Sequence, residues 1–200
     1  MKICISSFKG GSCKSSLAVN LALTLPGNHG IITNDVYSPL ETVLPESRFL
    51  KVLYDEPFPD LPEDSNIIYD LGGYIDPRTT HALRTSDVVI VPCLPEYIDL
   101  QMTIDCITEI ERFNPNILVA ITKTKGNDFS FASAVIEKFY KYPIFEIKYS
   151  RAFPAIFKEK ISIQDMVNQG GLKAYNYRAV NEQFNSLLEV IEKQGEIAWT

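Results

Sequence analysis

The feature that most constrains the fold is a strand, a glycine-containing turn and a helix within the first 23 residues. Ile3 and Ile5 alternate in a short apolar run, and the segment from Leu17 to Leu23 has apolar residues at helical spacing. The intervening sequence is Phe8-Lys9-Gly10-Gly11-Ser12-Cys13-Lys14-Ser15-Ser16. Because glycine permits backbone angles that other residues avoid, this turn can place a loop at the N-terminus of the helix.

A loop of this kind favours a polyphosphate. Unpaired backbone N–H groups and the positive end of the helix dipole attract anions there. We expect Lys14 to reach the terminal phosphates and Ser15 to bind Mg²⁺. The predicted nucleotide-binding residues are Gly10, Gly11, Ser12, Cys13, Lys14, Ser15 and Ser16. An ordinary glycine turn between strand and helix is the alternative interpretation.

Acidic residues follow two further predicted strands. The apolar run 67–69 ends at Asp70 and is followed by glycines, a Walker B pattern in which the Asp holds Mg²⁺ through a water. The run 31–33 ends at Asn34 and Asp35, and acidic groups at such strand ends face the ligand crevice of an open α/β sheet. A plain strand-ending Asp at position 70 and a turn aspartate at position 35 are the alternatives.

Further apolar runs alternate with helical patterns along the rest of the chain. The predicted strands are 87–92, 117–122 and 143–147, with 49–54 as a candidate short strand. One predicted helix follows Tyr97. A second has Phe131, Val135, Ile136 and Phe139 on one face, and a terminal helix covers about 174–193. Five or six such strands predict an α/β fold of the P-loop NTPase type, with a mostly parallel twisted sheet and helices on both faces. The length fits one domain over 1–200.

The composition is that of a soluble globular protein, with 46% hydrophobic and 22% charged residues. No apolar run approaches the ~18 residues needed to span a bilayer, and no signal peptide is recognisable. The four cysteines have no CxxC spacing, so neither a zinc site nor a disulfide framework is indicated. We expect a cytoplasmic protein without membrane attachment.

Charge is unevenly distributed. The net charge is −6, but residues 137–178 carry eight basic and four acidic side chains, which leaves −10 for the remainder. The candidate DNA-binding residues in this window are Arg151, Lys158, Lys160, Lys173 and Arg178. A merely solvated surface is the alternative interpretation.

The glycine turn resembles the deviant Walker A motif of the ParA/MinD superfamily, roughly Lys-Gly-Gly-x-Gly-Lys-[Ser/Thr]. Cys13 departs from this motif, which has Gly there, and Asp35 is the single carboxylate where the family has Asp-x-Asp. The resemblance also covers the Walker B segment, the turn after Pro92 and the helix start after Arg151. It implies that Lys9 is a signature lysine that reaches the partner's nucleotide across a dimer.

The resemblance implies an ATPase that uses ATP and Mg²⁺. Lys9, Lys14 and Asp35 would be its catalytic residues, and Ser15 and Asp70 its metal-binding residues. Similarity to the small ParA-type proteins, which lack an N-terminal DNA-binding extension, implies an ATP-dependent homodimer that binds nonspecific DNA. Such a dimer segregates plasmids or chromosomes, or positions cargo, and a ParB-type partner stimulates its slow hydrolysis. Nucleoid association in the ATP-bound state follows from this.

Two departures favour an alternative. Cys13 and the single carboxylate Asp35 suggest a degenerate protein of the same fold, which binds nucleotide or only a partner and acts as a dimeric scaffold or regulator. A P-loop enzyme that phosphorylates or ligates a small metabolite shares the fold, but no motif for its substrate is present. An iron–sulfur reductase is disfavoured because the cysteines lack a ligand pair.

Overall fold

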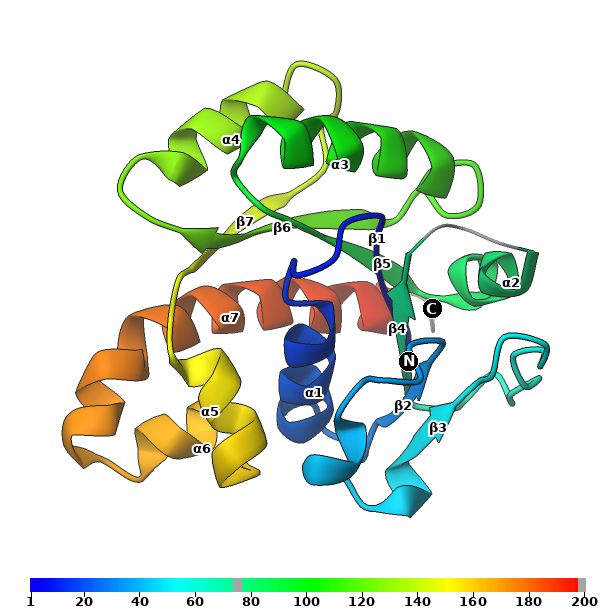
Figure 1. The fold of residues 1–200 in the computed structure, drawn as a ribbon, viewed down its shortest axis with the longest axis horizontal. Coiled ribbons are helices and arrows are strands. Elements are labelled where there is room, and N and C mark those ends of the chain that lie inside the picture. The colour runs from blue at the N-terminus through cyan, green and yellow to red at the C-terminus, as the bar shows by residue number, and fades with distance from the viewer. Residues whose placement is uncertain (74–76, 198–200) are drawn as a thin grey trace.

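A seven-stranded sheet forms the centre of the molecule. The computed structural model describes residues 1–73 and 77–197 (Figure 1). All strand pairs are parallel, and the strand order is β3-β2-β4-β1-β5-β6-β7. The strands are β1 (Lys2–Ser7), β2 (Gly30–Thr33), β3 (Phe49–Lys51), β4 (Ile67–Gly72), β5 (Val88–Cys93), β6 (Ile117–Thr124) and β7 (Ile144–Lys148). The predicted α/β class and parallel sheet are confirmed.

Strand β1 occupies the middle of this sheet, and all six of its residues are buried. Its register pairs Ile5 with Asp70 of β4 on one side and with Ile90 of β5 on the other. Since parallel strands all end at the same edge, the loops after β1, β2 and β4 meet there. This arrangement places the glycine turn beside the two acidic strand ends.

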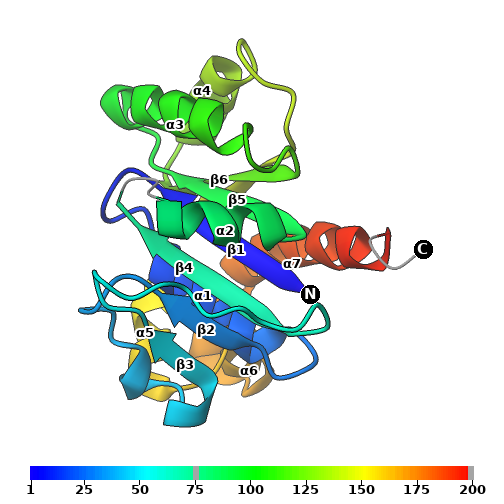
Figure 2. The same cartoon turned by 90° about the vertical axis from the view of Figure 1, so that its right-hand side faces the viewer.

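Helices cover both faces of the sheet (Figures 1 and 2). On one face, α1, α5, α6 and α7 pack in one apolar cluster with Ile3 and Ile5, and on the other, α2, α3 and α4 pack in a second cluster with Val89 and Val91. The α-helices are α1 (Lys14–Thr24), α2 (Pro77–Thr85), α3 (Tyr97–Ile110), α4 (Asp128–Ile136), α5 (Ala152–Glu159), α6 (Ile163–Asn168) and α7 (Gly171–Ile197). Two 3₁₀ turns, Leu40–Thr42 and Glu46–Arg48, precede β3.

The terminal helix packs as its spacing predicts, although it starts three residues earlier than expected. Phe184, Leu187 and Ile191 of α7 are each at most 1% exposed and belong to the same cluster as α1 and α5. Burial of such side chains contributes ~2 kcal/mol each, so α7 anchors one face of the sheet. None of the described helices is long and apolar enough to cross a membrane.

Two local predictions were wrong, and one helix was not predicted. The helix expected to present Phe131 and Phe139 ends at Ile136, and both phenylalanines are more than half exposed. The buried residues of α4 are Ala132 and Ile136, one helical turn apart, and these two suffice for its short contact with the sheet. Strand β3 ends at Lys51 rather than at residue 54, and helix α2 was not predicted because its sequence, PRTTHALRT, has only two apolar residues on the buried face, Ala82 and Leu83.

Candidate functional site

The glycine turn forms a loop at the start of α1. The helix begins at Lys14, and its N-cap residue, Cys13, provides no side-chain hydrogen bond. The first N–H groups of a helix have no acceptor within the helix itself, and no acidic residue lies in the first turn of α1. The loop therefore directs unpaired donors and the positive end of the helix dipole toward the carboxyl edge of the sheet.

Cys13 adopts the left-handed backbone conformation that the motif reserves for glycine. Its φ is 69°, and Gly11 nearby has a φ of 78°. A side chain with a β-carbon is strained in this region by ~1–2 kcal/mol. The Thr122 hydroxyl of β6 lies within hydrogen-bond distance of the Ser12 carbonyl, at 3.3 Å, and of the Cys93 carbonyl, at 3.2 Å, and so links the residue before Cys13 to the sheet.

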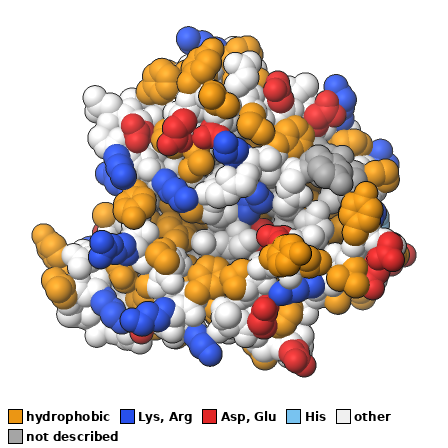
Figure 3. All heavy atoms as spheres, in the orientation of Figure 1, with side chains coloured by type: hydrophobic (Ala, Val, Ile, Leu, Met, Phe, Trp, Pro, Cys, Tyr) orange, Lys and Arg blue, Asp and Glu red, His pale blue; other side chains and the backbone are white. Residues whose placement is uncertain are grey.

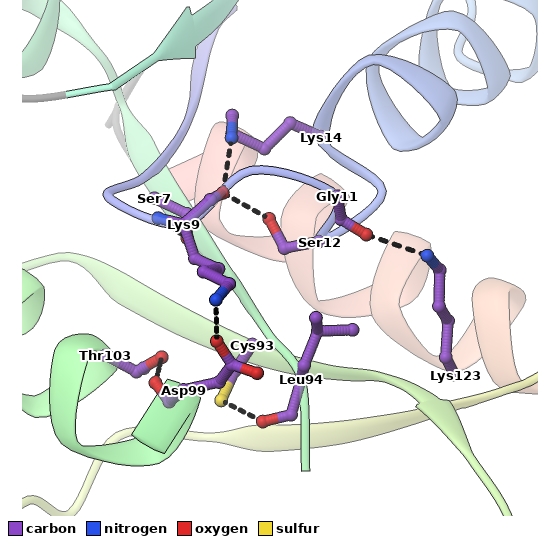
Figure 4. Close-up of polar contacts among 10 residues, drawn as sticks. All are labelled: Ser7, Lys9, Gly11, Ser12, Lys14, Cys93, Leu94, Asp99, Thr103 and Lys123. Atoms are coloured by element: carbon purple, nitrogen blue, oxygen red, sulfur yellow. Dashed lines mark hydrogen bonds and ion pairs between the residues drawn. The ribbon is translucent and has the colours of Figure 1, made fainter. Parts of the chain in front are cut away.

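Two lysine side chains bind carbonyl groups of the loop itself (Figure 4). The Lys14 ammonium donates to the Lys9 carbonyl at 2.9 Å, and the Lys123 ammonium donates to the Gly11 carbonyl at 2.8 Å. The Ser12 hydroxyl also donates to the Lys9 carbonyl, at 3.3 Å. Burial lowers the pKa of Lys14, and the nearby Asp70 carboxylate partly opposes this. The loop thus holds two cations next to its own N–H groups, where a phosphate would replace the carbonyl groups as their partner.

Asp70 lies beneath this loop in β4, two residues before the end of that strand at Gly72. Asp70 as a whole is 1% exposed, and its Oδ2 has no hydrogen-bond partner among the described residues. Burial raises the pKa of Asp70 to about 6, and the hydroxyl of Ser15 and the ammonium of Lys14 offset only part of this rise. A buried oxygen without a partner, next to a serine hydroxyl, fits the oxygen donor set that Mg²⁺ prefers. Ser15 and Asp70 are therefore the residues that would hold it.

The loop after β2 adds a polar wall. The Asp35 side chain accepts a hydrogen bond from the Tyr37 N–H at 3.0 Å, the Asx turn expected of a turn aspartate, and the residue is exposed at the edge of the cavity. The preceding Asn34 accepts from the Gly72 N–H at 2.8 Å and donates to the Gly72 carbonyl at 3.3 Å. These two bonds fix the loop after β2 to the end of β4, a role of Asn34 that no sequence motif indicates.

A cavity of about 790 Å³ opens over the loop. Its charged lining side chains are Lys14, Lys123, Lys148 and Asp35. The residues after β7 and on α5 that line the cavity are mostly apolar. The lining residues there are Tyr149, Ser150, Phe153, Pro154 and Phe157. Cationic and aromatic side chains that line one cavity of this size suit a molecule that combines phosphates with a planar ring.

Lys9 points away from this cavity, toward α3. Its ammonium pairs with Asp99 Oδ1 at 3.0 Å, on the side of the loop opposite to Lys14 (Figure 4). In the single chain, Lys9 is therefore bound to Asp99 and does not lie in a position to serve a second protomer's site. Sequence reasoning missed Asp99, Lys123 and Lys148 because each is brought to the loop by the sheet order rather than by a local motif.

The five candidate DNA-binding residues lie at the corner formed by α5, α6 and the start of α7. All five are exposed, and Lys173 forms an ion pair with Glu159 at 2.8 Å. On the face seen in Figure 3, Lys and Arg side chains predominate over Asp and Glu toward the lower left, where these helices lie. Lys138 and Lys141, from the same basic window of the sequence, instead follow α4 on the opposite face of the sheet.

No protein-family model and no curated protein sequence matches the chain. Solved structures match it over nearly its whole length. Apo McdA from Cyanothece has a TM-score of 0.68 at 13% identity, covering 95% of this chain and 98% of that one. A putative plasmid partition protein from Borrelia burgdorferi bound to AMPPNP has a TM-score of 0.63 at 17% identity, with 96% and 98% covered. The MinD cell division protein from Aquifex aeolicus has a TM-score of 0.61 at 17% identity, with 94% and 96% covered.

These structures share the fold that the deviant Walker A motif predicted, although their sequences are distant. The glycine turn, the Walker B strand and the all-parallel sheet lie in one arrangement. The chain therefore has the fold of the ParA/MinD superfamily of P-loop ATPases.

Proposed function

We propose that the chain is a ParA-like ATPase that binds Mg·ATP in the cavity over the glycine turn and hydrolyses it slowly as a homodimer. The observation that carries this proposal is the make-up of the cavity. Lys14, Lys123 and Lys148 supply its positive charge, and Tyr149 and the nearby aromatic residues of α5 also line it. The triphosphate would lie against the lysines and the N–H groups of the loop, and the base against the aromatic residues.

Phosphoryl transfer to water requires that the reactants be positioned and that the charge of the phosphates be neutralised, and different residues of the site serve these two needs. Lys14 leaves the Lys9 carbonyl to bind the terminal phosphates, and Asp35 orients the attacking water. Mg²⁺ held by Ser15 and Asp70 supplies further neutralisation of phosphate charge. Lys9 completes the site of the second protomer. Exposed Tyr37, Tyr97 and Ile98, each at least 69% exposed and close to Asp35 or Asp99, are apolar surface that a dimer would bury.

Titration of the purified protein with a fluorescent ATP analogue and Mg²⁺ tests nucleotide binding. We expect saturable binding that Lys14→Ala weakens by at least about tenfold, because one charge-assisted contact to phosphate is lost. Lys138→Ala is the matched control, since this exposed lysine lies outside the cavity. Absence of saturable binding to the wild type would overturn the proposal.

Phosphate release separates an enzyme from a second candidate, a scaffold that binds nucleotide without turnover. The scaffold is favoured by Cys13, strained at a glycine position, and by Asp35, whose carboxylate already accepts the Tyr37 N–H. Release above background that Asp35→Asn and Lys14→Ala abolish supports the ATPase. Nucleotide binding without release, with duplex DNA present, supports the scaffold.

Binding of nonspecific DNA by the ATP-bound dimer, and stimulation by a ParB-type partner, complete the proposal. The exposed basic corner of α5 to α7 supports the first part. A mobility shift with random-sequence duplex should require Mg·ATP and weaken steeply with salt. Combined Arg151→Ala and Lys160→Ala should reduce it, whereas combined Lys138→Ala and Lys141→Ala, on the opposite face, should not. A shift that is equal in all three proteins, or independent of ATP, would contradict this assignment.

A further inference from the structure

The ion pair between Lys9 and Asp99 links the phosphate loop to α3. The Lys9 ammonium lies 3.0 Å from Asp99 Oδ1, and the side chains are 41% and 9% exposed respectively. Asp99 lies in the first turn of α3, a helix that packs on the other face of the sheet from α1. Lys9 is the only cation paired with Asp99 in the described part of the chain.

We propose that Asp99 is a positioning residue for Lys9, which it holds within its own protomer and so restrains dimerisation. This inference rests on the proposed function, in which Lys9 serves the nucleotide of a second protomer. In the free protein, the lysine that would cross the interface is instead paired with Asp99 of its own protomer. Dimerisation requires the ion pair in each protomer to open.

The geometry couples this opening to nucleotide. The same residue, Lys9, offers its carbonyl to the Lys14 ammonium at 2.9 Å and its ammonium to Asp99 at 3.0 Å, on opposite sides of the loop (Figure 4). A triphosphate draws Lys14 off this carbonyl and so removes one of the contacts that fix the backbone at Lys9. The loop then has fewer restraints against swinging its Lys9 side chain outward.

The burial of Asp99 makes the restraint effective. Once Lys9 leaves, a carboxylate that is only 9% exposed remains without its counterion, and an unpaired buried charge is unfavourable. The contact of Lys9 with the nucleotide of the other protomer, its trans contact, must offset this loss in both protomers. A neutral side chain at position 99 removes the loss and leaves the trans contact intact, so the dimer should tighten.

The first measurement examines the ion pair without nucleotide. Limited acetylation of lysines, quantified by mass spectrometry, reports how available the Lys9 amine is. Lys9 should react several-fold faster in Asp99→Asn than in the wild type, with the exposed Lys138 as internal reference. Asp105→Asn, an exposed position on the same helix, should leave the Lys9 rate unchanged. An equal Lys9 rate in the wild type and Asp99→Asn would overturn the proposal.

The second measurement is the dimer dissociation constant by sedimentation velocity with Mg²⁺ and AMPPNP. Asp99→Asn should dimerise about tenfold more tightly, equivalent to ~1.4 kcal/mol shared between the two ion pairs. The gain should be absent from Asp105→Asn. Adding Asp99→Asn to Lys9→Gln should not tighten the dimer, because Asp99 acts through Lys9. Asp99→Ser serves if the Asn variant does not fold.

The outcomes distinguish this inference from the proposed function. If the wild type dimerises with AMPPNP and Asp99→Asn is no tighter, the positioning role fails and the ATPase proposal stands. If the gain persists without Lys9, Asp99 acts on the interface by itself and the inference is again overturned. If no variant binds AMPPNP or dimerises, the proposed function fails and a restraint on dimerisation fails with it, whatever the acetylation rates show.

Discussion

Replacing Asp70 by Asn removes a buried negative charge while preserving the shape of the side chain. Asp70 is 1% exposed, and its Oδ2 has no hydrogen-bond partner among the described residues. Burial raises its pKa from an ordinary 3.8 to about 6. In the nucleotide-free protein this carboxylate therefore opposes folding when it is ionised, and the Asn variant should be the more stable of the two proteins.

The magnitude follows from the pKa. A rise from 3.8 to about 6 is roughly 2 pH units, and each corresponds to ~1.4 kcal/mol, so the ionised form costs ~3 kcal/mol of folding free energy. The folded protein holds this proton more tightly than the unfolded chain does. The wild type therefore loses stability as the pH rises from about 4 to about 6, and the full loss applies above that range. Asp70→Asn should gain up to ~3 kcal/mol at pH 8 and nothing at or below pH 4.

Urea unfolding followed by circular dichroism, without nucleotide or Mg²⁺, gives the free energy of unfolding across this pH range. Asp105→Asn on the exposed face of α3 is the matched control and should follow the wild type. Burial lowers the pKa of His29 to about 4, which makes stability fall in acid, but this contribution is common to all three proteins and cancels in the difference. Equal stability of the wild type and Asp70→Asn at pH 8, or a gain that does not change with pH, would refute the reasoning.

Four further changes have defined outcomes. Cys13→Gly relieves ~1–2 kcal/mol of left-handed strain but adds freedom to the unfolded chain, so urea stability should change little while affinity for Mg·ATP rises by a few-fold in the fluorescence titration. His29→Gln should lessen the fall in unfolding free energy as the pH drops from 6.5 toward 4, because the folded wild type holds that proton less tightly than the unfolded chain. Phe184→Ala should lose ~3–5 kcal/mol of unfolding free energy, whereas Tyr175→Ala, at a position 79% exposed, should stay within ~0.5 kcal/mol. Lys148→Ala should weaken ATP-analogue binding by a few-fold without changing urea stability, and an unchanged affinity would remove Lys148 from the phosphate site.

The parts of the site that the sequence predicts are those formed by neighbours in the chain. The glycine turn before a helix and the Asp70 carboxylate on an apolar strand each depend on a few consecutive residues, and the structure has both, although α1 begins at Lys14 rather than Leu17 and β4 continues past Asp70 to Gly72. Apolar runs that alternate with helical patterns likewise predict the parallel sheet, because strands buried on both faces are predominantly apolar. Local physics is sufficient for these elements.

The remaining parts depend on which strands are neighbours. Lys123 reaches the Gly11 carbonyl from 112 residues away, and Asp99 reaches Lys9 only because α3 follows β5, the strand beside β1. The two hydrogen bonds between Asn34 and Gly72, one donated by each residue, need β2 and β4 to be paired in register. No periodicity or motif in a single sequence specifies such pairings. The end of α4 was misjudged for a related reason, since the exposed Phe139 has no place on the sheet that could bury it.

The position of β1 bears on how long a ligand would stay bound. This strand is paired on both sides, to β4 and β5, whereas β3 and β7 each have one neighbour. Local openings that expose margins of the sheet to solvent leave the support of the glycine turn intact. Amides at the edges of the sheet can therefore exchange with solvent while the strand that carries the loop, and with it the support of any bound ligand, stays paired on both sides.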